Sequence, residues 1–285
     1  MCKETDAAAT TSMRQHFPPV LRRPMATAGT IVLLLAATMG LFATLYRLDD
    51  SAMQTTESGE AEGDTWEPTR RAAEPAFDAM RAAMVDQQLR RRDIDSPAVL
   101  EAMSTVARHE FVPSDIQGLA YSDEALPIAH HQTISQPYIV ALMTQLAKPT
   151  SESKVLDVGT GSGYQAAVLG KLCKQVYSIE IVEPLASQAR ERLQHLGYDN
   201  IEVRHGDGFG GWPEQAPFDL IIVAAAPRKI PQPLIDQLAP GGRLVIPVGD
   251  RMQHLNVVEK SPDGNIKQWR VIPVAFVPMT GKAQK

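Results

Sequence analysis

One short stretch, residues 155–164, constrains what this chain of 285 residues can fold into more than any other. It reads VLDVGTGSGY, an apolar run that ends in an acid and is followed by three glycines at alternate positions and a segment of helical character. This pattern predicts a strand that feeds a helix through a tight turn. No side chain stands at Gly159, Gly161 or Gly163, so a ligand can lie directly against the backbone there. The N–H groups at the helix start would face that ligand. The stretch therefore predicts a nucleotide-binding turn.

The spacing of these glycines and a neighbouring acid indicate which nucleotide binds. The dinucleotide fingerprint GxGxxG separates its last two glycines by three residues, so that the helix start can approach a pyrophosphate. Here the pattern is GxGxG, and Asp157 stands two residues before the first glycine. A carboxylate repels a pyrophosphate but attracts the sulfonium and ammonium groups of S-adenosylmethionine. We therefore interpret the turn as a methyl-donor site with Asp157 as a cofactor ligand, and the alternative is a nicotinamide oxidoreductase.

Acids also end the next two predicted strands. Glu180 follows the apolar run at 176–179, where it could hold the two ribose hydroxyls. Asp207 and Gly208 follow the strand expected at 201–204, and Asp207 could accept a hydrogen bond from the adenine amino group. Each acid alone is weak support, because acids often cap strands and turns. Three at consecutive strand ends favour a methyl-donor site.

The pattern along the rest of this part of the chain predicts an α/β fold. Strands that alternate with helices indicate a parallel doubly wound sheet, with ligands bound outside the carboxyl ends of the strands. Two strand-like runs joined through residues 262–264 predict an antiparallel hairpin at the end. Ser96 and Pro97 are typical of a helix start. Helices are expected at 77–92, 98–106, 137–146, 184–196 and 231–238, and further strands at 220–223, 244–247, 255–258 and 269–277.

The first 69 residues are expected to lie outside this domain. Residues 24–46 carry no charge and exceed the roughly 20 residues that a helix needs to cross a bilayer. Basic residues concentrate in the segment 1–23, which predicts an inside N-terminus. A retained anchor, a cleaved signal peptide and a mis-set start codon all stay open. Residues 47–69 are acidic and polar and predict a disordered linker, which leaves 70–285 as a single domain.

Composition excludes several classes of function. The net charge of −5 and the pI near 5.8 offer no basic footprint for nucleic acid. Cys2 and Cys173 lie on opposite sides of the apolar segment, so neither a disulfide framework nor a cysteine metal cluster is expected. His130 and His131 suggest a metal or a base, but two adjacent histidines without a third ligand are more typical of a loop. We therefore expect no metal and no nucleic-acid partner.

The second informative stretch is the loop at 121–137, which leads into the helix expected from Pro137. Ser135 could be the N-cap of this helix or a catalytic residue, and the two roles are compatible. The TISQP element at 133–137, the glycine turn and RHGDG at 204–208 together resemble the protein-L-isoaspartate O-methyltransferase family. The resemblance extends over residues 77–281 and is also carried by PFD at 217–219, IIV at 221–223, LAPGGR at 238–243 and FVP at 276–278.

This resemblance implies a Rossmann-like class I S-adenosyl-L-methionine-dependent methyltransferase fold, with N-terminal helices and a C-terminal antiparallel strand. It implies that Ser135 is the active-site residue and that Thr133, Ile134 and Ser135 border both ligands. The implied activity is methylation of L-isoaspartyl and D-aspartyl residues in damaged proteins, by a monomeric, cytoplasmic enzyme. Residues 24–46 instead suggest anchoring in an inner membrane, or export.

One departure from the family pattern bears on specificity. The family usually has GxG just before the QTIS element, and Ala129, His130 and His131 stand there in this chain. This change could reshape the substrate loop. An alternative function is therefore a methyltransferase-fold protein with an altered substrate or lost turnover.

Overall fold

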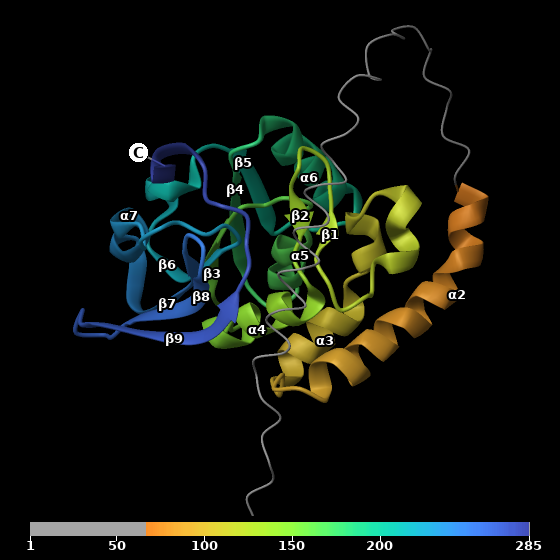
Figure 1. Ribbon diagram of the computed structural model, residues 1–285, viewed down its shortest axis with the longest axis horizontal. Coiled ribbons are helices and arrows are strands. Elements are labelled where there is room, and N and C mark those ends of the chain that lie inside the picture. Colours follow the sequence, from red (N-terminus) through yellow and green to blue (C-terminus); the bar gives the residue numbers. More distant parts are fainter. Residues whose placement is uncertain (1–66, 285) are drawn as a thin grey trace, which may run out of the picture. The chain divides into compact units, whose positions relative to one another are not determined.

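The structure, a computed structural model, describes residues 67–284 (Figure 1). The segments 1–23 and 24–46 and most of the expected linker lie outside the described residues. Helix α2 (Glu67–Ala83) begins inside the range that the sequence assigned to the linker. Among the helices of the described part of the chain, none combines the length and the apolar character needed to cross a bilayer.

A mixed sheet of seven strands organises this part of the chain, in the order β5-β4-β3-β6-β7-β8-β9. The strands from β5 to β7 run parallel, whereas β8 is antiparallel to both of its neighbours. The parallel α/β sheet and the terminal hairpin predicted from the sequence are confirmed. The strands are β3 (Lys154–Val158), β4 (Gln175–Glu180), β5 (Ile201–His205), β6 (Phe218–Val223), β7 (Leu238–Gly249), β8 (Gln253–Lys260) and β9 (Ile266–Val274).

The strand order reverses at the centre of the sheet. The chain runs from β3 outward to β4 and β5, then returns to place β6 on the other side of β3. In open α/β sheets, ligands bind in the crevice at the carboxyl ends of the two strands that flank this reversal. The glycine turn follows β3, so the topology places it at this crevice.

Both faces of the sheet are buried, which explains the continuous apolar runs in the central strands. Alternate residues of β6 face opposite sides, with Leu220 and Ile222 in one core cluster and Ile221 and Val223 in the other. On the first face pack α4 (Pro137–Ala147), α5 (Tyr164–Gly170) and α6 (Glu183–His195), and the earlier elements η1 (Met84–Arg90) and α3 (Pro97–Thr105) pack on α4 (Figure 1). The short helix α7 (Gln232–Asp236) covers the second face.

One of the two helices expected before the sheet has different bounds in the structure, and the start of the other is confirmed. The helix predicted at 77–92 begins at Glu67 and changes to π-helical geometry over Met84–Arg90. The helix start at Ser96 is confirmed, because the Ser96 hydroxyl accepts a hydrogen bond from the Val99 N–H at 3.4 Å and Pro97 is the first helical residue.

The Pro-Gly-Gly run at 240–242 lies between the helix expected at 231–238 and the strand expected at 244–247, but in the structure it lies within a strand. Strand β7 already begins at Leu238, and the pairing with β6 shifts register so that residues 239–242 form a bulge. A Cβ on Gly242 would lie 2.8 Å from the Ala239 carbonyl oxygen and 2.9 Å from that of Asp219. Residue 242 is therefore glycine because the backbone packs closely at this bulge. In the sequence, a Pro-Gly-Gly run after a predicted helix is more typical of a helix end.

Candidate active site

A cavity of about 1050 Å³, its open mouth included, lies at the carboxyl ends of the parallel strands. Six segments of the chain line it, and they carry the two acids Glu180 and Asp207 but no Lys, Arg or His. The lining residues are 132–135, 158–162 with 164–165, 179–182, 207–208, 224–225 and 277–280, with Val140 and Met143 from α4. Predicted site residues from four separate elements thus meet in one cavity.

The three glycines of the turn have different structural roles. All have positive φ, +93° at Gly159, +52° at Gly161 and +93° at Gly163, a region that favours glycine. Gly159 and Gly161 line the cavity. Gly163 does not line it, and a Cβ there would lie 3.3 Å from the Leu193 side chain on α6. The first two glycines therefore leave bare backbone at the cavity, while Gly163 allows α5 to approach α6.

Asp157 lies beneath the turn and not in the cavity wall. Its side chain is fully buried, and one carboxylate oxygen accepts a hydrogen bond from the Ser178 hydroxyl at 2.7 Å. The other oxygen, Oδ1, has no partner among the described residues. Burial raises the pKa of Asp157 to about 7, and the nearby Glu180 carboxylate adds to this, while the Ser178 hydrogen bond opposes it. Direct contact between Asp157 and a cofactor, as the sequence suggested, is not what this geometry favours.

Glu180 ties the glycine turn to the segment after β4. Its Oε2 accepts a hydrogen bond from the Gly161 N–H at 2.8 Å, and its Oε1 accepts one from the Val182 N–H at 3.0 Å. The side chain is only 6 % exposed, yet it lines the cavity. Glu180 is therefore placed to hold the turn and to present lone pairs to a ligand at the same time.

Asp207 and Gly208 follow β5 at the far end of the cavity. Asp207 accepts backbone hydrogen bonds from Phe209 at Oδ1 and from Lys282 at Oδ2, both at 2.9 Å. The second bond fastens the C-terminal segment over this end of the cavity. A Cβ on Gly208 would lie 2.4 Å from Val158 Cγ1, so any other residue there would collide with the end of β3. The expected adenine contact of Asp207 stays a prediction.

The loop predicted at 121–137 contains a small hairpin. Strands β1 (Leu126–Pro127) and β2 (Thr133–Ile134) pair, and His130 and His131 form the turn with φ of 59° and 56°. Two consecutive residues with positive φ define a turn type in which Asn-Gly is preferred. The histidines therefore occupy positions that favour glycine or asparagine, and the hairpin keeps its turn at a cost in backbone strain. Both side chains are exposed, and no cluster of three metal-ligating side chains occurs in residues 67–284.

Ser135 is not the N-cap of α4, which corrects one of the two roles considered from the sequence. The N-cap is Gln136, and its side chain makes no capping bond but donates to the Asp123 carbonyl at 2.7 Å. Because Pro137 fixes the first helical position, the cap falls one residue later than the serine. Ser135 lines the cavity beside Thr133 and Ile134, and their contact with the two ligands stays a prediction.

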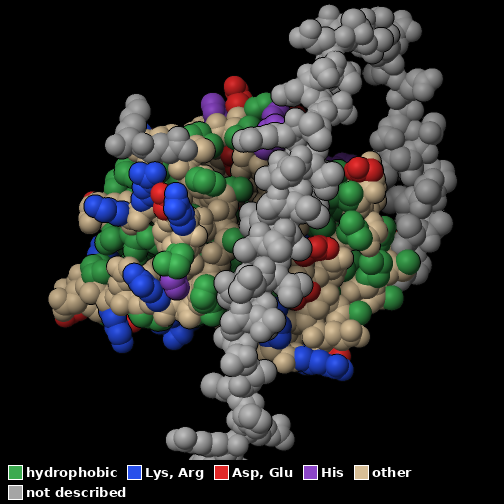
Figure 2. Space-filling model, in the orientation of Figure 1, with side chains coloured by type: hydrophobic (Ala, Val, Ile, Leu, Met, Phe, Trp, Pro, Cys, Tyr) green, Lys and Arg blue, Asp and Glu red, His purple; other side chains and the backbone are tan. Residues whose placement is uncertain are grey.

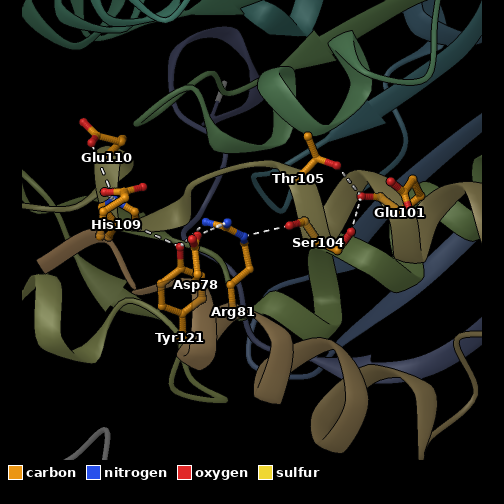
Figure 3. Close-up of polar contacts among 9 residues, drawn as sticks. Asp78, Arg81, Glu101, Ser104, Thr105, His109, Glu110 and Tyr121 are labelled. Atoms are coloured by element: carbon orange, nitrogen blue, oxygen red, sulfur yellow. Dashed lines mark hydrogen bonds and ion pairs between the residues drawn. The ribbon is translucent and has the colours of Figure 1, made fainter. Parts of the chain in front are cut away.

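Helices that precede the sheet hold both ends of this loop. At its start, Tyr121 receives a hydrogen bond from Arg81 at 3.3 Å and lies 2.8 Å from His109 Nδ1, and Arg81 also donates to the Ser104 carbonyl (Figure 3). Arg92, just after η1, connects the start of the loop to the residue that follows it. Its guanidinium pairs with Asp123 at 3.2 Å and lies 3.3 Å from the centre of the Tyr138 ring.

Three consecutive arginines lie at the end of the π-helical segment, and they differ in their contacts. Arg90 and Arg91 are mostly exposed, whereas Arg92 contacts both Asp123 and Tyr138. Nothing in the local pattern distinguishes Arg92 from its neighbours, because its partners lie far along the chain.

Sequence reasoning also missed two lining segments. Ala224 and Ala225 follow β6 at the carboxyl edge, and residues 277–280 come from the C-terminal segment. Backbone hydrogen bonds join the two, from Ala226 N–H to the Val277 carbonyl at 2.8 Å and from Met279 N–H to the Ala226 carbonyl at 2.9 Å. The rule that ligands bind at strand ends could have identified Ala224, whereas the C-terminal segment has no regular pattern to reveal it.

The chain is similar in sequence to known enzymes. The family model described as protein-L-isoaspartate(D-aspartate) O-methyltransferase matches residues 79–284. Protein-L-isoaspartate O-methyltransferase 2 of Syntrophobacter fumaroxidans is 53 % identical over 221 residues, which cover 74 % of this chain and 90 % of that protein. The protein-L-isoaspartate O-methyltransferase of Gloeobacter violaceus is 54 % identical over 199 residues, or 69 % of this chain and 97 % of that protein.

A solved structure agrees with the fold. A Plasmodium falciparum protein described as a protein-L-isoaspartate O-methyltransferase, in complex with S-adenosyl-L-homocysteine, matches with a TM-score of 0.62 at 27 % identity. The match covers 70 % of this chain and 98 % of that one.

Proposed function

Because the chain belongs to the protein-L-isoaspartate (D-aspartate) O-methyltransferase family, we propose that it transfers a methyl group from S-adenosyl-L-methionine to the free carboxylate of L-isoaspartyl and D-aspartyl residues. The observation that carries the proposal is one cavity in which the cofactor-type turn at Gly159 and Gly161 and the Thr133–Ile134 strand with Ser135 meet.

The chemistry of the cavity wall fits a cationic nucleotide. Its charged side chains are the acids Glu180 and Asp207, and Asp157 lies buried behind it with one unpartnered oxygen. Acids without a base in the lining favour a sulfonium and an ammonium group and oppose a pyrophosphate, which argues against a nicotinamide cofactor. S-adenosyl-L-methionine, when bound, supplies a methyl group on a sulfonium that carboxylates can accept. Gly161 and Glu180 would hold its nucleoside part, and Asp207 and Gly208 would border the adenine.

The residues near Ser135 can do the remaining work by positioning alone. The free carboxylate of the substrate, with a pKa of about 4, is ionised at neutral pH, so the reaction needs no general base. The Ser135 hydroxyl, which has no hydrogen-bond partner among the described residues, is free to donate to one substrate oxygen. Apolar lining from Ile134, Val140 and Met143 excludes water from the transfer.

The product explains why such an enzyme serves protein repair. Esterification turns the free carboxylate into a methyl ester. The neighbouring backbone nitrogen attacks the ester carbonyl carbon, and methanol leaves. The succinimide that results then opens by hydrolysis, in part to a normal aspartyl linkage. The substrate therefore has to enter as an extended, accessible peptide segment.

The alternative of an altered substrate or lost turnover rests on His130 and His131. The turn at these residues keeps the left-handed backbone that glycine would adopt, and Thr133 and Ser135 still reach the cavity. These observations support retained activity on isoaspartyl peptides.

The expected division of the chain is part of the same proposal. We place the methyltransferase domain at about 70–285, behind an acidic linker, as a monomer. Membrane association through residues 24–46 would be tested by fractionating cells that express the full chain and a variant lacking residues 1–46, since only a retained anchor keeps the full chain with membranes.

The decisive test of the reaction uses three peptides that differ at one position, with isoaspartate, aspartate or asparagine, and labelled S-adenosyl-L-methionine. We expect a base-labile methyl ester on the isoaspartyl peptide alone. Equal labelling of the aspartyl peptide would refute the specificity, and no labelling of any peptide while the cofactor still binds would support the altered-substrate alternative.

A further inference from the structure

A group of basic side chains lies beside the mouth of the cavity, outside the residues that line it. Arg228 and Lys229 follow the lining residue Ala225 by three and four positions, and Arg251 lies in the turn between β7 and β8. All three are exposed. We refer to Arg228, Lys229 and Arg251 as the basic rim.

Backbone contacts place the basic rim next to the cavity. The Gly249 N–H donates to the Pro227 carbonyl at 3.0 Å, which brings the β7–β8 turn against the segment that carries Arg228. The Gln253 side chain holds Phe276 by two hydrogen bonds, at 3.0 and 2.7 Å, immediately before the lining residue Val277. Both basic segments therefore attach to the wall formed by residues 224–225 and 277–280.

The charge of the basic rim is only partly balanced. Arg228 pairs with Asp250 at 3.3 Å, with both side chains largely exposed. Lys229 and Arg251 form no ion pair with any carboxylate in residues 67–284. Figure 2 shows Lys and Arg side chains gathered over the part of the molecule that carries β7 to β9. The rim thus presents net positive charge in a protein whose overall charge is −5.

We propose that the basic rim is a subsite for acidic side chains that flank the methylated residue, so that the enzyme selects isoaspartyl peptides with a nearby Glu or Asp. The proposal rests on the proposed function and deepens it. Arg228 is three residues from Ala225, so their Cα atoms lie at most about 10 Å apart. An extended peptide covers the same distance in about three residues. For an isoaspartate bound beside Ala225, the favoured acid therefore lies within about three residues.

The selection should appear in KM and depend on salt. Exposed charge pairs are individually weak. The two unpaired bases Lys229 and Arg251, beside the Arg228–Asp250 pair, should together lower KM by about fivefold at low ionic strength, where the Debye length is about 30 Å at 0.01 M. The effect should fade at 0.5 M salt. Because the rim does not touch the reacting atoms, kcat should not change.

The test measures kcat and KM of the full chain on isoaspartyl peptides that carry Glu, Gln or Lys three residues before or after the isoaspartate. The variant R228Q/K229Q/R251Q removes the rim. The control R90Q/R91Q/K174Q removes the same number of charges from exposed, ion-paired sites elsewhere, at side chains that are 60 %, 71 % and 69 % exposed.

We expect the wild type and the control to prefer the Glu peptide on at least one side, and the rim variant to treat the Glu and Gln peptides alike while its KM for the Gln peptide is unchanged. Equal KM values for Glu and Gln peptides in the wild type, or an equal loss of preference in the control, would overturn the proposal. Failure of the proposed function would look different, since no isoaspartyl peptide would then be methylated at all.

Discussion

Replacing Glu180 by glutamine separates the two tasks that the structure gives to this carboxylate. In the native protein, its two oxygens accept hydrogen bonds from the Gly161 and Val182 N–H groups. A glutamine amide offers one oxygen and one NH₂ group. One of the two backbone N–H groups therefore loses its acceptor and faces a donor in a site that is almost fully buried.

The expected loss of stability follows from the one backbone N–H group that is left without an acceptor. A buried donor without a partner costs about 1–3 kcal/mol. For a domain of about 200 residues, this corresponds to a fall in Tm of about 2–12 °C. If the same carboxylate also accepts hydrogen bonds from ribose hydroxyls, each such bond to a charged group is worth about 1.5–3 kcal/mol, or about 10- to 100-fold in cofactor affinity.

Thermal unfolding without ligand and calorimetric titration with S-adenosyl-L-homocysteine measure the two effects separately. The matched control is E183Q, the same change at an exposed residue at the start of α6. We expect E180Q to lower both Tm and affinity, and E183Q to change neither. If E180Q unfolds at the wild-type temperature and binds the ligand as tightly as the wild type, the account of the glycine turn is wrong.

Three further predictions follow from individual residues. S135A should lower kcat for the isoaspartyl peptide at least tenfold while the affinity for S-adenosyl-L-homocysteine stays within twofold, since Ser135 lines the cavity, does not cap α4 and is proposed to hold the substrate carboxylate; an unchanged kcat would refute this role. H130N/H131G should raise the free energy of unfolding by about 1–2 kcal/mol in urea titrations, because asparagine and glycine adopt the left-handed backbone of this turn more readily than histidine. A decrease would refute strain in the turn. Burial holds the pKa of Asp157 at about 7, above its value near ~4 in the unfolded chain, so the native state binds the extra proton and stability should fall as pH rises from about 4 to 7. D157N should flatten that slope in urea titrations at fixed pH, and an equally steep slope in the variant would contradict the assignment.

The parts of the site that the sequence predicts are those with a local signature. These are the glycine turn, the TISQP element and the acids at consecutive strand ends, and the site residues predicted from them all line the cavity except Asp157 and Gly163. Those two are informative exceptions. An acid before a glycine turn looks the same in sequence whether it faces a ligand or, like Asp157, lies beneath the turn on Ser178.

Long-range contacts account for what the sequence does not reveal. The loop at 121–137 is held by Arg81 and Arg92. Their partners in the loop, Tyr121 and Asp123, lie 40 and 31 positions further along the chain. Residues 277–280 line the cavity because Ala226 bonds to them, which no periodicity predicts. Likewise, the bulge at 239–242 depends on how β7 pairs with β6, while the Pro-Gly-Gly run by itself indicates only the end of a helix.

The central claim is that one cavity holds the methyl donor and presents the isoaspartyl carboxylate to it. The most direct measurement is a crystal structure of the protein with S-adenosyl-L-homocysteine and an isoaspartyl peptide. We expect the nucleoside between Gly161, Glu180 and Gly208, and the free α-carboxylate of the isoaspartate within hydrogen-bond distance of Ser135 with one oxygen facing the ligand sulfur. A ligand sulfur far from Ser135, or a peptide bound away from residues 133–135, would contradict the account.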